Sequence, residues 1–245
     1  RFELTQDQTE TFAARGLLRF DGLLPEGAVT RARQAVERSF APLGYWRDGA
    51  WRLDHRAKPR FPDKGFTAKQ IGNKQKEVVA LLEEPALIAV VDALMGGKAF
   101  DRTMAKRPQV LVTLPNEGAW TAPVGWHVDV PRLPGGASLG VQMFACLDTV
   151  EKGGGGTCVI AGSHRLLNDR GFFRNHQMTS ELKREPFFRE VFAGETPPPN
   201  AVVHGTPVEM VELTGAPGDV WFMDLRMFHA GAPNASERPR MMATH

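Results

Sequence analysis

Residues 125–129 read Gly-Trp-His-Val-Asp, and this short stretch decides how the rest of the chain is interpreted. Residues i and i+2 of a strand project to the same face, so we expect His127 and Asp129 to point at one ion while Val128 packs the other way. His229, from another expected strand, supplies a second imidazole. Two His and one carboxylate suit ferrous iron and leave coordination positions open for a cosubstrate and O₂.

Arg240, which follows His229 along the chain, adds a second element to this pattern. Its planar guanidinium can hold a carboxylate through two parallel hydrogen bonds, so we expect it to bind the far end of a dicarboxylate cosubstrate. A His-x-Asp triplet often arises by chance, and structural histidines with satisfied hydrogen bonds are the alternative interpretation. The combination of three ligands with a carboxylate clamp favours the iron site.

Further stretches spread over nearly the whole chain support the same interpretation. They are residues 4–8 leading to 16–20, the block at 125–129, Ile-Ala-Gly-Ser-His at 160–164, Pro-Gly-Asp at 217–219, and the segment 229–240. Together they resemble the phytanoyl-CoA dioxygenase-like branch of the iron(II)/2-oxoglutarate-dependent oxygenases. The chain departs from this pattern at Ala161, where relatives commonly have Pro, but this turn position puts no catalytic residue in doubt.

The resemblance implies a fold and a set of roles. The fold would be mainly β with flanking helices, built on a double-stranded β-helix (jelly-roll, cupin-like) core. Iron would be bound by His127, Asp129 and His229, and Arg240 would hold the C5 carboxylate of 2-oxoglutarate. A halogenase is disfavoured, because such an enzyme needs a vacant position for chloride where Asp129 stands.

Three polar residues are weaker candidates for binding the cosubstrate. Gln109 and Thr113 lie four apart on an expected strand and share a face, which on a barrel strand can point inward. Either could reach an oxygen of 2-oxoglutarate, and a buried polar group bonded to backbone is the alternative. Thr157 is the third candidate. We expect Trp126 to wall the pocket, since an apolar surround limits stray oxidation.

The composition is consistent with one domain over residues 1–245. The chain is 42% hydrophobic and 24% charged, and its formal charge of +2 does not by itself imply nucleic acid. No apolar run approaches the length of a membrane span, and residues 1–30 carry no signal-peptide pattern. We expect a cytoplasmic protein in which Cys146 and Cys158 are buried reduced thiols. Because the sequence starts without Met and ends inside an expected strand, we expect a longer natural chain.

The order of elements predicts a helical part, residues 1–105, packed on a β-helix core, residues 106–245. Helices are expected at 5–14, 25–40 and twice within 77–95, divided at Pro85; strands are expected at 16–20, 109–114, 139–147, 157–160, 208–212, 220–222 and 240–244. The gap at 165–207 shows no clean periodicity and contains three consecutive prolines. An insertion of that length is usually a lid or binding loop.

Other features favour structural roles. The glycines at 153–156 lack the Lys-Ser/Thr of a phosphate-binding loop and predict a turn. Asp148 is expected to bond backbone groups, and His164 to be structural or at the pocket edge.

The stretch 45–76 is rich in basic and aromatic residues. It is interpreted either as a solvated surface or as a cover in which Arg56, Lys58 and Arg60 bind an anionic substrate.

We therefore expect a dioxygenase that oxidises a small organic substrate, by hydroxylation or otherwise, and releases succinate and CO₂ from 2-oxoglutarate. Two alternatives from other classes stay open. One is a cupin-like zinc hydrolase or isomerase, which would have no use for Arg240 as a carboxylate clamp. The other is a non-catalytic binding barrel, which would tolerate loss of metal ligands, and none is lost.

Overall fold

The computed structural model describes all residues except 1, 54–73, 97–107, 117, 137 and 169–173. Its helices are α1 (Gln6–Arg15), α2 (Glu26–Ser39), α4 (Lys76–Leu81), α5 (Pro85–Leu94), α6 (Asn175–Leu182) and α7 (Pro186–Ala193), with 3-10 turns η1 (Ala41–Leu43), η2 (Pro134–Gly136) and η3 (Ser163–Arg165). Its strands are β1 (Leu17–Phe20), β2 (Trp46–Arg47), β3 (Ala50–Trp51), β4 (Gln109–Thr113), β5 (Val141–Cys146), β6 (Thr157–Ala161), β7 (Ala201–Val203), β8 (Thr206–Glu212), β9 (Val220–Asp224), β10 (His229–Gly231) and β11 (Arg240–Thr244).

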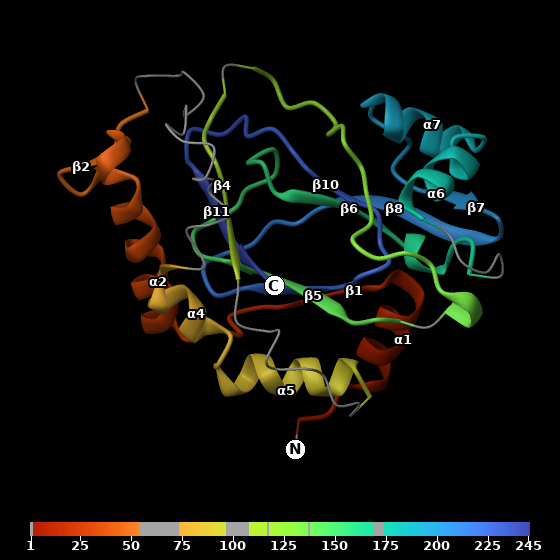
Figure 1. Cartoon of the computed structure of the whole chain (residues 1–245), viewed down its shortest axis with the longest axis horizontal. Coiled ribbons are helices and arrows are strands. Elements are labelled where there is room, and N and C mark those ends of the chain that lie inside the picture. The colour runs from red at the N-terminus through yellow and green to blue at the C-terminus, as the bar shows by residue number, and fades with distance from the viewer. Residues whose placement is uncertain (1, 54–73, 97–107, 117, 137, 169–173) are drawn as a thin grey trace.

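Two antiparallel sheets form the centre of the protein (Figure 1). The large sheet has the order β1-β9-β5-β11-β4, and the small sheet has the order β10-β6-β8-β7. From β4 onward the chain crosses repeatedly between the two sheets, and His127 forms an isolated bridge to His229 at the edge of the small sheet. This alternation is that of a double-stranded β-helix, as predicted from the sequence.

Helices cover the outer face of the large sheet. The side chains between them form a helix-side cluster to which Val29 and Val36 of α2, Leu81 of α4 and Val90 of α5 contribute. Alternate residues of the sheet strands, such as Met241 and Ala243 of β11, enter the same cluster, because successive strand residues point to opposite faces. The described N-terminal helices thus pack on the β core, and β1 lies at the edge of the large sheet.

The opposite faces of the strands enclose an interior cluster. Its buried members are Leu17, Phe144, Cys146, Val150, Val159, Ala161, Leu213, Met223, Met227 and Met242, which come from both sheets. A third, small-sheet cluster lies on the outer face of the small sheet, where Ile160 and Ala230 meet Met178 and Leu182 of α6 and Phe188 of α7. The interior cluster therefore defines which strand residues face the inside of the barrel.

The local signals that begin and end α1 were readable in the sequence. The Thr5 hydroxyl accepts from the Gln8 amide at 3.1 Å, and the Gln8 side chain accepts from the Thr5 amide at 2.9 Å, a reciprocal capping box. The helix ends at Gly16, whose φ of +67° is the left-handed conformation. A Cβ on Gly16 would lie 2.5 Å from His164 Nδ1, so both backbone and packing require glycine there.

The expected irregular insertion at 165–207 is the main correction to the predicted fold. It contains α6, α7 and β7, and its apolar side chains Met178, Leu182 and Phe188 are fully buried. Figure 1 shows α6 and α7 on the side of the molecule opposite α2 and α4. The spacing of Met178 and Leu182, four residues apart, was the helical signal that the proline run obscured. A lid function for this segment stays a prediction.

Two features assigned structural roles have clear partners. The glycine turn at 153–156 wraps around a carboxylate of its own chain, since Glu212 accepts from the Gly153 amide at 2.7 Å and the Gly156 amide at 3.0 Å. These amides already bind an anion, which agrees with a turn rather than a phosphate loop. Asp148 accepts from the Thr149 amide at 2.8 Å, as predicted.

The cysteines and helices also bear on the predicted environment. Cys146 and Cys158 are buried and free of disulfide bonds, as expected, and burial raises the pKa of Cys146 to about 12. None of the described helices has both the length and the apolar character needed to cross a bilayer. Arg56, Lys58 and Arg60 lie outside the described residues, so the interpretation of the basic stretch stays a prediction.

Candidate metal centre

The two short segments that carry His127 and His229 run side by side. The His127 amide donates to the His229 carbonyl at 3.1 Å, and the His229 amide donates to the His127 carbonyl at 2.9 Å. The predicted strand at 127–129 is wrong in one respect: only His127 is bridged, and Asp129 lies in a bend. The bend still turns Asp129 toward the histidines, while Val128 packs in the small-sheet cluster as predicted.

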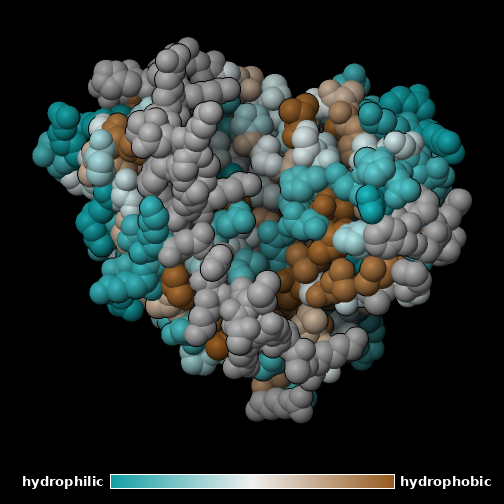
Figure 2. Space-filling model, in the orientation of Figure 1, coloured by the Kyte–Doolittle hydropathy of each residue, from teal (hydrophilic) through white to brown (hydrophobic). Residues whose placement is uncertain are grey.

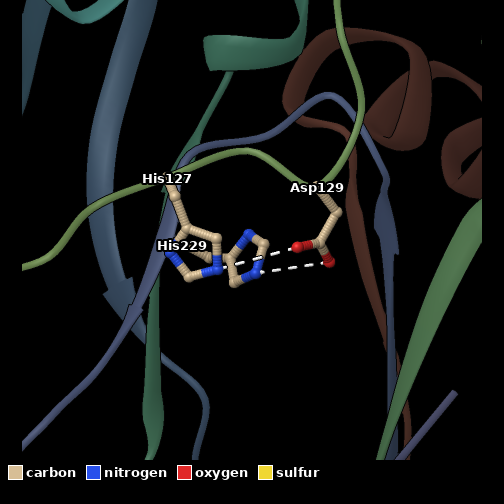
Figure 3. A group of neighbouring side chains, drawn as sticks. All are labelled: His127, Asp129 and His229. Carbon is tan, nitrogen blue, oxygen red and sulfur yellow. Dashed lines mark ion pairs between the residues drawn. The ribbon is translucent and has the colours of Figure 1, made fainter. Parts of the chain in front are cut away.

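The structure brings the three predicted ligands together (Figure 3). His127 Nε2 lies 3.6 Å from Asp129 Oδ1, and His229 Nε2 lies 3.6 Å from Asp129 Oδ2. One ligand atom from each residue falls within 4.8 Å of the others. The imidazole centroids are 4.4 Å apart, with the rings tilted at 51°. Three donor atoms this close, two nitrogens and one oxygen, could hold one divalent cation as a facial set.

Backbone carbonyls fix which nitrogen of each imidazole is free. His127 Nδ1 lies 3.0 Å from the Gly125 carbonyl, and His229 Nδ1 lies 3.2 Å from the Met227 carbonyl. A carbonyl oxygen only accepts hydrogen bonds, so Nδ1 of each ring carries the proton. Both Nε2 atoms are left with lone pairs directed to the site, an arrangement that orients metal-binding histidines in proteins.

The site is open on one side and closed on the other. The side chains of His127 and Asp129 are 46% and 40% exposed, whereas that of His229 is 8% exposed. Burial lowers the pKa of His229, although the neighbouring Asp129 carboxylate acts against this change. The neutral imidazole, which is the form that binds metal, is therefore favoured at His229.

Arg240 is buried at the start of β11 and lacks partners for much of its guanidinium. Its residue is 5% exposed, and among the described residues its Nε and Nη1 atoms have no hydrogen-bond partner. Burial lowers the pKa of Arg240 to about 10, so the side chain remains cationic at neutral pH. A buried cation with unsatisfied donors is costly unless an anion binds it. This is what a clamp for a carboxylate requires.

Arg240 and His229 face the same interior. Arg240 alternates with Met241, which points to the helix-side cluster, and shares its face with Met242 of the interior cluster. His229 pairs in register with Val159, another member of the interior cluster. Side chains of residues paired across antiparallel strands lie on one face of the sheet. The clamp and the metal ligand thus line one barrel interior.

Thr113 and Asn234 support the clamp. Arg240 Nη2 donates to Thr113 Oγ1 at 2.7 Å. Asn234, which is fully buried, donates through Nδ2 to the Thr113 carbonyl at 2.9 Å and to the Arg238 carbonyl at 2.7 Å. Sequence reasoning identified Thr113 but missed Asn234. Its place between His229 and Arg240, two residues given roles, was the only signal for it.

The other cosubstrate candidates are placed differently. Gln109 shares a face with Thr113, but it is exposed and pairs with Thr244 at the opposite end of β11 from Arg240. Four residues of strand separate it from Thr113 by roughly 13 Å, so the structure does not bring Gln109 to the clamp. Thr157 is buried and alternates with Cys158 on β6, which turns its side chain to the interior side.

Trp126 lies away from the expected pocket wall. It belongs to the small-sheet cluster together with Val128, and its indole Nε1 donates to the Pro123 carbonyl at 2.9 Å. The alternation of side chains that points His127 to the metal site points Trp126 to the opposite side. The contacts observed for Trp126 are therefore those of a packing residue.

The sequence matches a known protein family over most of its length. Residues 12–242 match the phytanoyl-CoA dioxygenase (PhyH) family. The chain belongs to this family. Its members are iron(II)/2-oxoglutarate-dependent dioxygenases, and the predicted enzyme class and cofactors are thereby confirmed. The comparison with curated proteins found no match.

Solved structures share the fold at low sequence identity. The "non-heme alpha ketoglutarate dependent carbocyclase SnoK from nogalamycin biosynthesis" is 20% identical with a TM-score of 0.62, over 98% of this chain and 82% of SnoK. AviO1 from Streptomyces viridochromogenes Tue57 is 20% identical with a TM-score of 0.61, over 100% and 94% of the two chains. EctD from S. alaskensis, solved with 2-oxoglutarate and 5-hydroxyectoine, is 18% identical with a TM-score of 0.60, over 98% and 74%.

Proposed function

We propose that this member of the phytanoyl-CoA dioxygenase family binds iron(II) through His127, Asp129 and His229 and oxidises a small organic substrate. The observation that carries the proposal is the pairing of this triad with Arg240, a buried cation that has unsatisfied donors and faces the same interior. Iron(II) held there would supply the oxidising chemistry, with O₂ and 2-oxoglutarate as cosubstrates and succinate and CO₂ as their products.

Each residue has a definite task in this proposal. His127 and His229 present Nε2, because their Nδ1 protons are held by the Gly125 and Met227 carbonyls. Asp129 contributes the anionic oxygen of the set. Arg240 and the Thr113 hydroxyl bind the distal carboxylate of 2-oxoglutarate. By holding one carboxylate, Arg240 and Thr113 would set the orientation of the cosubstrate in the interior that His229 also faces.

The surface near the triad fits an organic substrate with an apolar part. Figure 2 shows apolar side chains gathered near the middle of this face, where Figure 1 draws the segment joining β4 to β5. The same segment carries His127 and Asp129. Exposed apolar side chains gathered in this way mark binding surfaces more often than isolated ones do.

SnoK and the related epimerase SnoN are named for reactions other than hydroxylation, so the fold accommodates several outcomes. The proposal for this chain is therefore oxidation of the substrate, by hydroxylation or by another route. An anionic substrate is part of the proposal only because Arg56, Lys58 and Arg60 are basic. These three residues lie outside the described part of the chain.

The test is to incubate purified protein with iron(II), 2-oxoglutarate and a metabolite extract, and to measure succinate and the masses of the small molecules. We expect succinate to form in step with one product that has gained one oxygen or lost two hydrogens. Parallel reactions with Zn(II) serve as the control. Product formation with Zn(II) but without succinate would replace the proposal with non-oxidative chemistry.

A further inference from the structure

The Gly162-Ser163-His164 stretch at the start of η3 has no part in the proposed site, yet Ser163 is fully buried and contacts both segments that carry metal ligands. Gly162 begins the turn with a φ of +85°, and a Cβ there would lie 2.2 Å from the Pro207 carbonyl oxygen. The position of Ser163 is therefore tightly fixed between β6 and β8.

The Ser163 hydroxyl holds the segment that carries His229. Its Oγ accepts a hydrogen bond from the Phe228 amide at 3.0 Å. The Phe228 carbonyl accepts from the Ile160 amide at 2.9 Å, so the peptide groups on both sides of Phe228 are fixed to the turn and to β6. Phe228 directly precedes His229. The hydroxyl thus fixes the backbone from which this ligand projects.

The Ser163 carbonyl holds the segment that carries Asp129. It accepts from Arg132 Nη2 at 2.7 Å, and Arg132 Nε donates to the Leu166 carbonyl at 3.1 Å. Arg132 is fully buried and follows Asp129 by three residues. Burial lowers its pKa to about 10, so it donates these bonds as a cation at neutral pH. Hydrogen bonds from an ionised donor are about twice as strong as neutral ones.

A second anchor holds the same segment further along. The Asp224 carboxylate accepts from Arg226 Nε at 2.8 Å and from Arg226 Nη2 at 2.7 Å, and Arg226 Nη1 donates to the Gly136 carbonyl. The chain that leaves Asp129 is therefore fixed at Arg132 and again at Gly136. These anchors matter because Asp129 itself lies in a bend, without strand pairing to hold it.

We propose that Ser163 and Arg132 are positioning residues that fix Asp129 relative to His229 and so set the affinity of the site for metal. The inference rests on the proposed iron site. The Ser163 hydroxyl holds the backbone next to His229, and the Arg132 guanidinium holds the segment that carries Asp129. Neither touches the metal, and the histidine pair alone would not fix the carboxylate.

Cobalt(II) titration under anaerobic conditions tests the inference, because bound cobalt(II) reports coordination through its visible absorption and needs no turnover. We expect Ser163→Ala and Arg132→Lys each to raise the cobalt dissociation constant about tenfold, since residues that orient metal ligands commonly contribute at least this much. The absorption bands should shift in both variants. The matched control is His164→Gln, in the same turn, where the side chain contacts the Ala13 carbonyl of α1 and not a ligand segment.

The outcomes separate the inference from the function on which it rests. Wild-type affinity and an unchanged spectrum in Ser163→Ala and Arg132→Lys would overturn the positioning role while leaving the iron site in place. An equal loss of affinity in His164→Gln would also overturn it, because the effect would then come from general destabilisation. If Asp129→Ala binds cobalt as the wild type does, the iron site itself is wrong.

Discussion

Arg240 on β11 and Thr113 on β4 are register partners, and the guanidinium Nη2 donates to the threonine hydroxyl at 2.7 Å. The remaining Nε and Nη1 of Arg240 are buried without a partner in the described part of the chain. Arg238, two residues earlier, instead donates to the Asp148 carboxylate at 3.1 Å, and its side chain is 55% exposed. Strand pairing begins at Arg240, whereas Arg238 lies in the bend before the strand, so of these two arginines only Arg240 is held in the interior by the pairing with β4.

Replacing Arg240 with Lys should weaken binding of 2-oxoglutarate. Lysine retains the charge but loses the planar fork, and a hydrogen bond to a charged group contributes about 1.5–3 kcal/mol. We expect the Michaelis constant for 2-oxoglutarate to rise about 10- to 100-fold, with a much smaller change for the organic substrate. Steady-state kinetics measure both constants, and calorimetry with a redox-inert metal measures 2-oxoglutarate binding directly.

The control for this prediction is Arg238→Lys. Because Arg238 pairs with Asp148 near the surface, we expect little change in either Michaelis constant. If Arg238→Lys produced the larger effect, the assignment of Arg240 as the clamp would have to be abandoned.

Replacing Asp129 with Ala should remove metal binding and turnover while the fold persists. Asp129 is the anionic member of the triad, and its side chain is 40% exposed, so the substitution leaves no cavity in the core. Anaerobic iron(II) titration and thermal unfolding test the two parts of this expectation. Asp21→Ala, at a surface carboxylate that is 78% exposed, is the matched control and should bind iron normally.

Much of the architecture could be predicted because it depends on local patterns. The capping residue Thr5 marked the start of α1, Pro85 marked the start of α5, and short continuous apolar runs marked β4 and β11. The triad was predictable as well, because the spacing of His127 and Asp129 survives even though the segment is bent rather than extended. The prediction required only that the His127 and Asp129 side chains point the same way, and the bend at Asp129 achieves this as a strand would.

The contacts that join distant segments could not be predicted. Nothing in the text around Ser163 indicates that its hydroxyl binds the Phe228 amide or that its carbonyl binds Arg132. These bonds depend on the sheet topology, which brings η3 beside both ligand segments. The prediction for Gln109 failed for a related reason. Gln109 does share a strand face with Thr113, but the register between β4 and β11 pairs it with Thr244, at the end of β11 far from Arg240.

The buried histidine of η3 should make stability depend on pH. Burial lowers the pKa of His164 from 6.5 to about 4, so the unfolded chain binds a proton at this side chain where the folded protein does not. Stability should therefore fall as pH drops from about 6.5 toward 4. In His164→Gln this part of the fall is absent. The difference in unfolding free energy between the two proteins should change by about 2 kcal/mol from pH 7 to pH 5.

Urea unfolding of both proteins across this pH range measures that difference. Carboxylates that do not interact with His164 contribute equally to the two proteins and cancel, whereas Asp224 interacts with it. A difference that does not vary with pH would show that His164 is protonated as readily in the folded state as in the unfolded chain.

Finally, the helices of the 165–207 insertion should behave as part of the core. Phe188 of α7 is fully buried and packs on Phe228, next to the ligand His229, with ring centroids 5.9 Å apart. Phe188→Ala should lower the free energy of unfolding by about 3–5 kcal/mol, the usual cost of removing a buried phenylalanine. Arg189→Ala, at the exposed neighbouring position, should change the free energy of unfolding by less than about 0.5 kcal/mol.

A loosely attached cover would give a different result for Phe188→Ala. Such a cover would open before the rest of the protein unfolds, so the substitution would leave the main unfolding transition unchanged. Denaturant unfolding monitored by tryptophan fluorescence distinguishes these outcomes, since Trp126 packs in the same small-sheet cluster as Phe188.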